Sequence, residues 1–336
     1  MAGLFAGTLR PAILAASRRE GVRRAAEGLP ITRRVVHRFV PGETIESALD
    51  SVAALRQSGR FVSVDYLGED VSDADAADAT VRTYLDLIER LGGSGDPTGP
   101  VEVSVKLSAL GQSLERDGHK IARENAWSIC DAAQRAGVWV TVDAENHTTT
   151  ESTLRIVRDL RTDFPWLGTV LQAYLRRTLD DCEQFAAAGA RIRLCKGAYD
   201  EPASVAYRDP AAVTESYLRC LRVLMSGSGY PMVASHDPAV IQAVPALARE
   251  AGRPTTDFEY QMLYGIRDGE QRRLAESGNQ VRVYVPFGTQ WYGYFMRRLA
   301  ERPANLTFFL RALAQPGAAG RHHSRGAAAS AIPRSM

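Results

Sequence analysis

The sequence has almost no net charge, because 41 lysines and arginines are balanced by 39 aspartates and glutamates. A nucleic-acid-binding surface needs an excess of positive charge, so the composition gives no support to a nucleic-acid partner. Cysteine is also scarce: the chain has four, without CxxC or zinc-ligand spacing, at Cys130, Cys182, Cys195 and Cys220. We therefore expect buried free thiols in a reducing cytoplasm, with no disulfide framework and no metal site.

Long apolar runs and nucleotide-binding glycine motifs are missing as well. No apolar stretch approaches the length of a membrane span. Residues 1–38 nevertheless contain eight arginines against two glutamates, so this segment either packs against the body of the protein or lies on an anionic membrane surface. The expected location is the cytoplasm, either free or peripheral on the inner face of the membrane.

Short β-rich runs alternate with longer segments of helical pattern through most of the chain. The eight runs cover residues 61–67, 101–108, 138–145, 168–175, 190–197, 231–237, 257–263 and 280–288. Alternation of this kind predicts a parallel sheet, and eight units close a (β/α)8 barrel of the α/β class. An open doubly wound sheet is the alternative, but no GxGxxG follows the first run.

The chain divides into three parts on this interpretation. Residues 1–60 form an N-terminal helical segment, residues 61–314 form the barrel, and residues 315–336 form a tail. The tail is rich in glycine, alanine and serine and has no periodicity, which predicts disorder.

Polar side chains stand near the carboxyl end of every run. They are Asp65, Lys106, Asp143 with Glu145, Gln172 with Tyr174, Arg193 with Lys196, Ser235 with His236, Glu259 with Gln261, and Tyr284. In (β/α)8 barrels the chemistry collects at the carboxyl ends of the strands. The pattern therefore predicts a polar barrel mouth that contains the functional site.

The helical segment after the eighth run has two distinct faces. Tyr292, Phe295 and Leu299 form an ordinary core face. A second face carries Tyr294, Arg297, Arg298 and Glu301. That face is either a solvated one with an Arg297–Glu301 pair or a binding face for a small anion. Because the helix directly follows the last strand, it can lie over the mouth, which favours anion binding.

Six ordered motifs together resemble the proline dehydrogenase family over roughly residues 60–312. They are "VSVKLSALG", "VTVDAEN", "RLCKGAY", "ASHDP", "FEYQMLYGIR" and "VRVYVPFGTQWYGYFMRRLAERPAN". The resemblance is to the short, single-function type. It implies a distorted (β/α)8 barrel with N-terminal helices, a final helix over the mouth, and FAD held without a dinucleotide-binding motif.

The resemblance also implies an activity, the first step of proline catabolism to glutamate. L-proline would be oxidised to Δ1-pyrroline-5-carboxylate, with hydride passing from proline C5 to flavin N5. The electrons would go to a membrane quinone, and a separate pyrroline-5-carboxylate dehydrogenase would consume the product.

Site residues follow from the same motifs. For the substrate they are Arg297, Arg298 and Lys106 on the proline carboxylate, Tyr284 and Tyr294 around the ring, Leu263 as an apolar wall, and Asp143 ordering its neighbours. A guanidinium fork suits a carboxylate because it binds both oxygens. For FAD they are Arg193 near N5, Lys196 at phosphate, Gly197 and Tyr199 of the same motif, and Gln172, Ser235, His236, Asp143 and Glu301.

Plainer interpretations of these residues remain open. Lys106 and Lys196 could be solvated lysines at strand ends, Asp143 a helix N-cap, His236 a turn residue, and Tyr199 a core residue. Two other functions also remain. One is a cofactor-free Schiff-base lyase that uses Lys106 or Lys196 as the nucleophilic amine, and the other is a carboxylate-binding sensor without activity.

Overall fold

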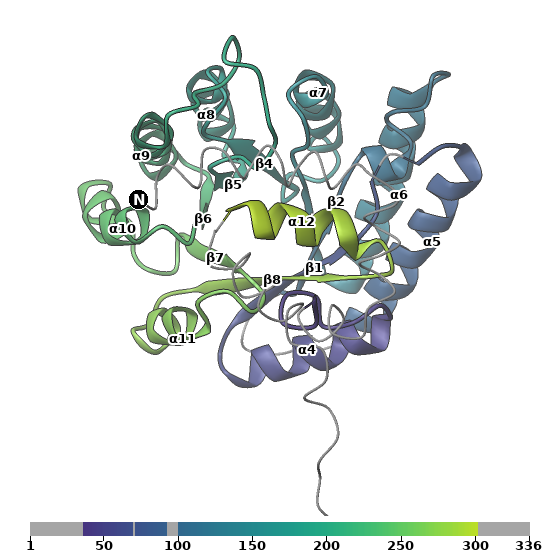
Figure 1. The fold of residues 1–336 in the computed structure, drawn as a ribbon, viewed down its shortest axis with the longest axis horizontal. Helices are drawn as coiled ribbons and strands as arrows, with labels where there is room; N and C mark the ends of the chain where they lie inside the picture. The colour runs from purple at the N-terminus through teal and green to yellow at the C-terminus, as the bar shows by residue number, and fades with distance from the viewer. Residues whose placement is uncertain (1–35, 70, 93–99, 302–336) are drawn as a thin grey trace, which may run out of the picture.

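In the computed structural model, which describes residues 36–69, 71–92 and 100–301, eight parallel strands close into a barrel (Figure 1). The strands are β1 (Phe61–Tyr66), β2 (Glu102–Val105), β3 (Trp139–Val142), β4 (Gly168–Gln172), β5 (Arg191–Cys195), β6 (Tyr230–Ala234), β7 (Glu259–Leu263) and β8 (Val281–Phe287). Each strand pairs with the next, and β8 pairs with β1 through a register that joins Ser63 to Tyr284. The predicted (β/α)8 barrel is confirmed, and the open-sheet alternative is wrong.

Helices surround the barrel, and one crosses its end (Figure 1). They are α4 (Ile45–Gln57), α5 (Ala74–Leu91), α6 (Gly118–Ala136), α7 (Thr150–Leu160), α8 (Thr178–Ala187), α9 (Pro210–Ser226), α10 (Pro238–Glu250), α11 (Asp268–Glu276) and α12 (Trp291–Glu301), with a 3-10 turn η1 at Ser108–Leu110. Helices α5 to α11 follow β1 to β7 in turn, whereas α4 precedes β1 and packs against both β1 and β8. Since α4 fills the place beside β8, α12 is free to lie over the barrel mouth.

Three aspartates begin the helices that follow strand ends. The carboxylate of Asp73 accepts a hydrogen bond from the backbone N–H of Ala76 at 2.8 Å and so caps α5. Asp209 and Asp237 cap α9 and α10 in the same way, and each is followed by proline at the first helical position. An acidic N-cap followed by proline satisfies free N–H groups and presets the helical φ angle. These short signals fix where the loops after β1, β5 and β6 end.

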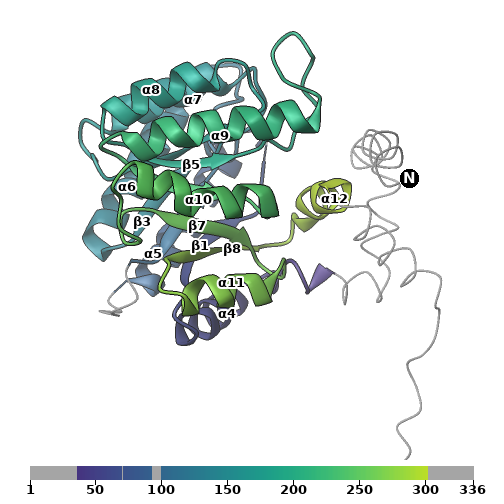
Figure 2. The same cartoon turned by 90° about the vertical axis from the view of Figure 1, so that its left-hand side faces the viewer.

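The apolar face of α12 holds this helix at the carboxyl end of the strands. Tyr292 and Phe295 are buried, as expected, in a cluster with Phe39 and Leu67. The rings of Phe39 and Phe295 lie 6.2 Å apart. Figure 2 shows α12 beyond the ends of the strands, clear of the helices that surround them. The other face of α12 is thereby directed to the mouth.

The interior of the barrel is charged. Inward-facing positions on the strands and directly after β2 and β3 hold four buried acids and four buried bases among the described residues: Asp65, Glu102, Asp143 and Glu259, with Lys106, Arg191, Arg193 and Arg282. Alternate positions such as Val64, Val103 and Val140 face outward and form the apolar core with the helices. Barrels of this fold usually fill their interior with branched apolar side chains. Here ion pairs take that place.

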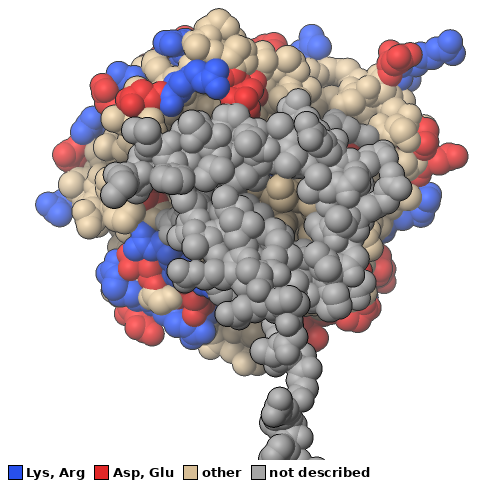
Figure 3. Space-filling model, in the orientation of Figure 1, with Lys and Arg blue, Asp and Glu red and all other residues tan. Residues whose placement is uncertain are grey.

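The cysteines are free thiols, and the described surface carries charges of both signs (Figure 3), as the balanced composition predicts. Cys130, Cys182 and Cys220 are buried free thiols, as expected, and Cys195 is half-buried. In the orientation of Figure 1, Figure 3 shows lysine and arginine side chains interspersed with aspartate and glutamate on the described part of the surface. Across the ranges described, no helix is long and apolar enough to cross a membrane. The interpretations of residues 1–35 and of the tail concern segments outside those ranges.

The pair between Arg282 and Glu259 gives a stability prediction. Arg282 Nε and a terminal nitrogen donate to the two Glu259 oxygens at 2.7 and 3.0 Å, and both residues are buried. Arg282→Met leaves an unpaired buried carboxylate, which should cost roughly 3–5 kcal/mol of unfolding free energy. The double variant Arg282→Met/Glu259→Met should lose clearly less than that single variant. Urea denaturation measures both. A double variant with the summed loss of both single variants would contradict the pairing argument.

Candidate active site at the barrel mouth

A buried network joins five strands, β1, β2, β3, β5 and β8, just inside the mouth. Lys106 Nζ lies 3.0 and 2.8 Å from the two Asp65 oxygens and 3.4 Å from Asp143 Oδ2. Asp143 also accepts a bond from Tyr284 Oη at 2.8 Å and one from Arg193 at 2.6 Å. Three other predicted site residues therefore meet around the carboxylate of Asp143. The interpretation of Asp143 as a helix N-cap is wrong, since Thr149 precedes α7.

Lys106 is neither solvated nor a suitable amine nucleophile. It is 7% exposed. Burial alone would lower the pKa of Lys106, but Asp65 and Asp143 together raise it well above its ordinary value. A Schiff-base lysine must lose its proton at neutral pH, which requires the opposite shift. Lys106 is therefore held as a cation at the floor of the mouth.

Arg297 of α12 forms a bidentate ion pair with the carboxylate of Glu69. Its two terminal nitrogens donate to the two Glu69 oxygens at 3.3 and 2.5 Å, and only 17% of its side chain is exposed. The guanidinium also lies 5.8 Å from the ring of Tyr199, and that of Arg298 lies 5.0 Å from the ring of Tyr294. Arg297 is thus not a solvated surface residue. Glu301 belongs to α12, but its side chain is outside the described part.

A second group of predicted residues lies at the ends of β5 and β6. Lys196 Nζ contacts Asp237 at 2.5 Å and Thr214 Oγ1 at 2.7 Å and remains half-buried. His236 Nε2 accepts a hydrogen bond from the backbone N–H of Leu263 at 2.9 Å. That bond orients the imidazole and assigns its proton to Nδ1. His236 is therefore more than a turn residue, because it ties the end of β6 to the end of β7.

Gln172 and Ser235 complete this side of the mouth. Gln172 Nε2 donates to the Glu145 carbonyl oxygen at 2.8 Å, and Ser235 Oγ accepts from the backbone N–H of Asp237 at 3.1 Å. Both residues are buried. The first bond links the end of β4 to the segment after β3, and the second lies at the start of α10.

The residues at the mouth fit an anionic flavin cofactor. The Nε atom of Arg193 is buried and has no hydrogen-bond partner within the described ranges. An orphaned buried donor costs free energy, so an acceptor from a bound group would satisfy it. Gly197 has φ of 110°, and an added Cβ would lie 2.2 Å from the Tyr174 ring. Only glycine lets the turn after β5 run so close to that ring.

Of four further acids near the site, the sequence predicted Asp65 and Glu145 at the mouth without a role and did not predict Glu69 and Glu102. Asp65 and Glu102 are fully buried partners of Lys106 and Arg193, Glu69 pairs with Arg297, and Glu145 binds Ser108. Strand alternation contained part of the signal, because Glu102 faces inward with Ser104 and Lys106. Glu69 follows β1 in a loop, where no periodicity applies.

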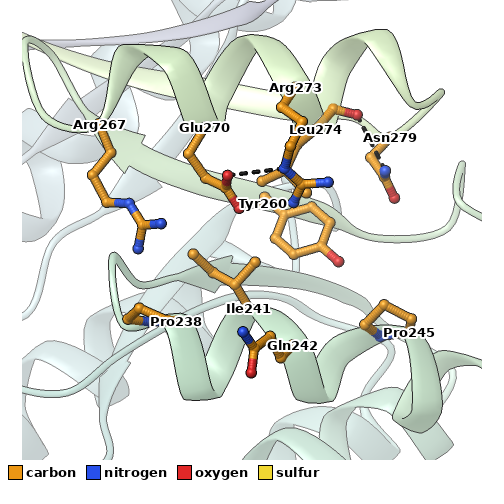
Figure 4. A pocket seen from close by; sticks show the side chains of 10 residues that line it. All are labelled: Pro238, Ile241, Gln242, Pro245, Tyr260, Arg267, Glu270, Arg273, Leu274 and Asn279. Carbon is orange, nitrogen blue, oxygen red and sulfur yellow. Dashed lines mark hydrogen bonds and ion pairs between the residues drawn. The ribbon is translucent and has the colours of Figure 1, made fainter.

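An open groove with a volume of about 510 Å³ lies elsewhere, between α10 and α11 (Figure 4). Its floor is Tyr260, the outward-facing neighbour of Glu259 and Gln261 on β7. None of the predicted site residues lines it. The groove therefore belongs to the outside of the helical wall and is separate from the mouth.

A sequence model of the family "Proline dehydrogenase" matches residues 48–311. "Proline dehydrogenase 1" of Bacillus subtilis subsp. natto is 38% identical over 282 residues, which are 84% of this chain and 91% of that protein. "Proline dehydrogenase" of Deinococcus radiodurans is 38% identical over 281 residues, with 83% and 90% covered. A crystal structure of proline utilization A (PutA) from Bdellovibrio bacteriovorus, inactivated by N-propargylglycine, superposes with a TM-score of 0.73 at 26% identity. That superposition covers 80% of this chain and 33% of the PutA chain.

Glu145 gives a pH prediction. Burial raises its pKa from the ordinary 4.5 to about 6, although two hydrogen bonds from Ser108 oppose the shift. A carboxyl group with a raised folded-state pKa stabilises the fold below pH 4.5, and this contribution is lost as pH rises through 6. The shift corresponds to about 2 kcal/mol.

Glu145→Gln removes this titration. The unfolding free energy of Glu145→Gln minus that of the wild type should therefore rise by about 2 kcal/mol between pH 4 and pH 7. Urea denaturation of flavin-free protein across that range measures it. Glu115→Gln, at an exposed position, is the control and should show no such rise. A pH-independent difference for Glu145→Gln would contradict the raised pKa.

Proposed function

The chain belongs to the proline dehydrogenase family and oxidises proline in proline catabolism, and we propose that it does so with FAD bound at the carboxyl end of its barrel. The product is Δ1-pyrroline-5-carboxylate. The observation that carries this proposal is the mouth, where Arg297 forks onto the Glu69 carboxylate and buried Lys106 is held as a cation. Such a mouth suits a small amino acid whose carboxylate must be paired once it leaves water.

The substrate carboxylate binds Arg297, Arg298 and Lys106. Glu69 occupies the Arg297 fork with the same chemical group, so its carboxylate stands in for that of proline. Glu69 must therefore release Arg297 when proline binds. Bidentate pairing is specific to a planar guanidinium and fixes the orientation of the bound carboxylate.

The pyrrolidine ring lies among Tyr284, Tyr294 and Leu263. Tyr284 is held by its hydrogen bond to Asp143 at 2.8 Å, and its ring faces Arg193, whose guanidinium carbon is 5.3 Å from the ring centroid. Asp143 thus orders Lys106, Arg193 and Tyr284 together. Fixing both ends of a substrate in this way lowers the barrier of the chemical step, because the reacting atoms meet without further ordering.

FAD, when bound, supplies the hydride acceptor at flavin N5 for the hydrogen of proline C5. Arg193 serves the flavin ring and Lys196 the phosphates. The remaining contacts come from Asp143, Gln172, Gly197, Tyr199, Ser235, His236 and Glu301. The orphaned Arg193 Nε and the cation of Lys196 support this division.

The electron acceptor we propose is a membrane quinone, and a separate pyrroline-5-carboxylate dehydrogenase consumes the product. The arginine-rich segment of residues 1–38 supports contact with an anionic leaflet from the cytoplasmic side. Turnover should run with a soluble quinone or dye, and turnover that depends on NAD⁺ would reject this acceptor.

A spectrum tests the cofactor and the activity together. The purified protein should show flavin absorption, and heat should release FAD. Anaerobic L-proline should bleach that absorption, because hydride transfer reduces the flavin. A colourless protein that refuses added FAD would favour the lyase, and a yellow protein that binds proline without bleaching would favour the sensor.

The arginine pair gives the kinetic test of substrate binding. Losing either Arg297 or Arg298 removes a charge-assisted hydrogen bond of about 1.5–3 kcal/mol. Arg297→Ala and Arg298→Ala should therefore lower kcat/KM for proline by roughly ten- to a hundredfold, mainly through KM, while FAD stays bound. Lysine should rescue poorly because it cannot form the fork. Arg222→Ala, which removes an exposed arginine, is the matched control. A near-wild-type KM for proline in both test variants would show that this face of α12 does not bind the substrate carboxylate.

A further inference from the structure

Glu102 is a fully buried acid near the candidate flavin site and is not among the residues proposed to contact substrate or flavin. It begins β2, four residues before Lys106, and its exposed fraction is 0%. One carboxylate oxygen accepts from Arg193 at 2.6 Å, and the other accepts from Arg191 at 2.6 Å. A single carboxylate thus bridges the two arginines of β5.

Arg193 is held by acceptors from three different strands. One terminal nitrogen donates to Asp143 of the β3 end at 2.6 Å. The other donates to Glu102 of β2, and more weakly to Ser63 of β1 at 3.3 Å. Glu102 and Asp143 therefore grip opposite ends of the guanidinium and leave only Nε without a partner in the described residues. The plane of the guanidinium is set by this grip.

Glu102 is ionised in spite of its burial. Burial alone would raise its pKa, but Arg191, Arg193 and Arg282 together hold that pKa below its ordinary value. Without this charge, Arg191 loses its ion-pair partner, and Arg193 keeps, among the described carboxylates, the ion pair with Asp143. Two neighbouring cations would then compete for the acceptors that remain at the end of the barrel.

We propose that Glu102 is a positioning residue that fixes the guanidinium of Arg193 for its contact with the flavin. The inference rests on the proposed function, because it gives Arg193 its flavin role. Glu102 touches neither substrate nor cofactor; it acts through Arg193. A buried acid at the start of β2 thereby controls the group that meets the flavin at the end of β5.

A double-mutant cycle between Glu102→Gln and Arg193→Met tests the coupling. The measurements are the FAD dissociation constant and the flavin reduction potential, since charge and hydrogen bonding near the ring tune both. In the wild-type background, Glu102→Gln should shift the potential, weaken FAD binding by about tenfold and lower kcat by about tenfold or more. The KM for proline should change by less than about threefold, because Arg297 and Arg298 bind the carboxylate.

In the Arg193→Met background, Glu102→Gln should change neither the potential nor the FAD dissociation constant. Equal effects of Glu102→Gln in both backgrounds would show that Glu102 does not act through Arg193 and would overturn the proposal. An unchanged potential and kcat in Glu102→Gln alone would overturn it as well. A wild-type protein that binds no FAD would instead refute the proposed cofactor, so the two failures are distinguishable.

Glu259→Gln is the matched control. Glu259 is equally buried and pairs with Arg282, whereas the described carboxylates that pair with Arg193 are Glu102 and Asp143. Its loss should lower stability while leaving the flavin potential unchanged. If Glu102→Gln does not fold, Glu102→Gln/Arg191→Met removes one acid and one base together and keeps the interior neutral. That variant should still shift the potential, and a wild-type potential in it would overturn the proposal.

Discussion

Charge balance inside the barrel is the constraint on which the rest of this structure depends. Four acids and four bases face inward with almost no exposure, so each ion must find its partner within the barrel. A buried charge that lost its partner would destabilise the fold by several kcal/mol. The strand register must therefore bring opposite charges together inside the barrel as well as pack the outer apolar core. The closed barrel does both.

The same network of ion pairs orients the side chains of the candidate active site. Asp143 lies where the chain of ion pairs from Glu102 through Arg193 reaches the mouth, and it there meets Lys106 and Tyr284. Residues that would bind substrate and cofactor are thus oriented by partners deeper in the barrel. Preorganisation of this kind is most precise on rigid strands. The residues on α12 are different, because Arg297 is paired with Glu69 of a loop and must exchange that partner for substrate.

Much of the fold could be predicted from the chain alone, and the reason is local. Apolar β-branched runs of strand length, aspartate–proline helix starts and polar strand ends all lie within a few residues of one another in the sequence. The eight runs predicted all eight strands, and the run at residues 61–67 exceeds β1 by one residue. The role of α4 could not be predicted in this way, since its place beside β8 depends on a contact between the two ends of the barrel.

The sequence by itself determined the residue types at the mouth, because strand alternation and the spacing on α12 assign each side chain to a face. Only the tertiary structure decided which charges meet. Lys106 pairs with Asp65, Arg193 with Glu102, and Arg297 with Glu69. The physical reason is that partners in an ion pair are chosen by distance across the closed barrel, and separations of 41, 91 and 228 residues leave no periodic signal in the chain.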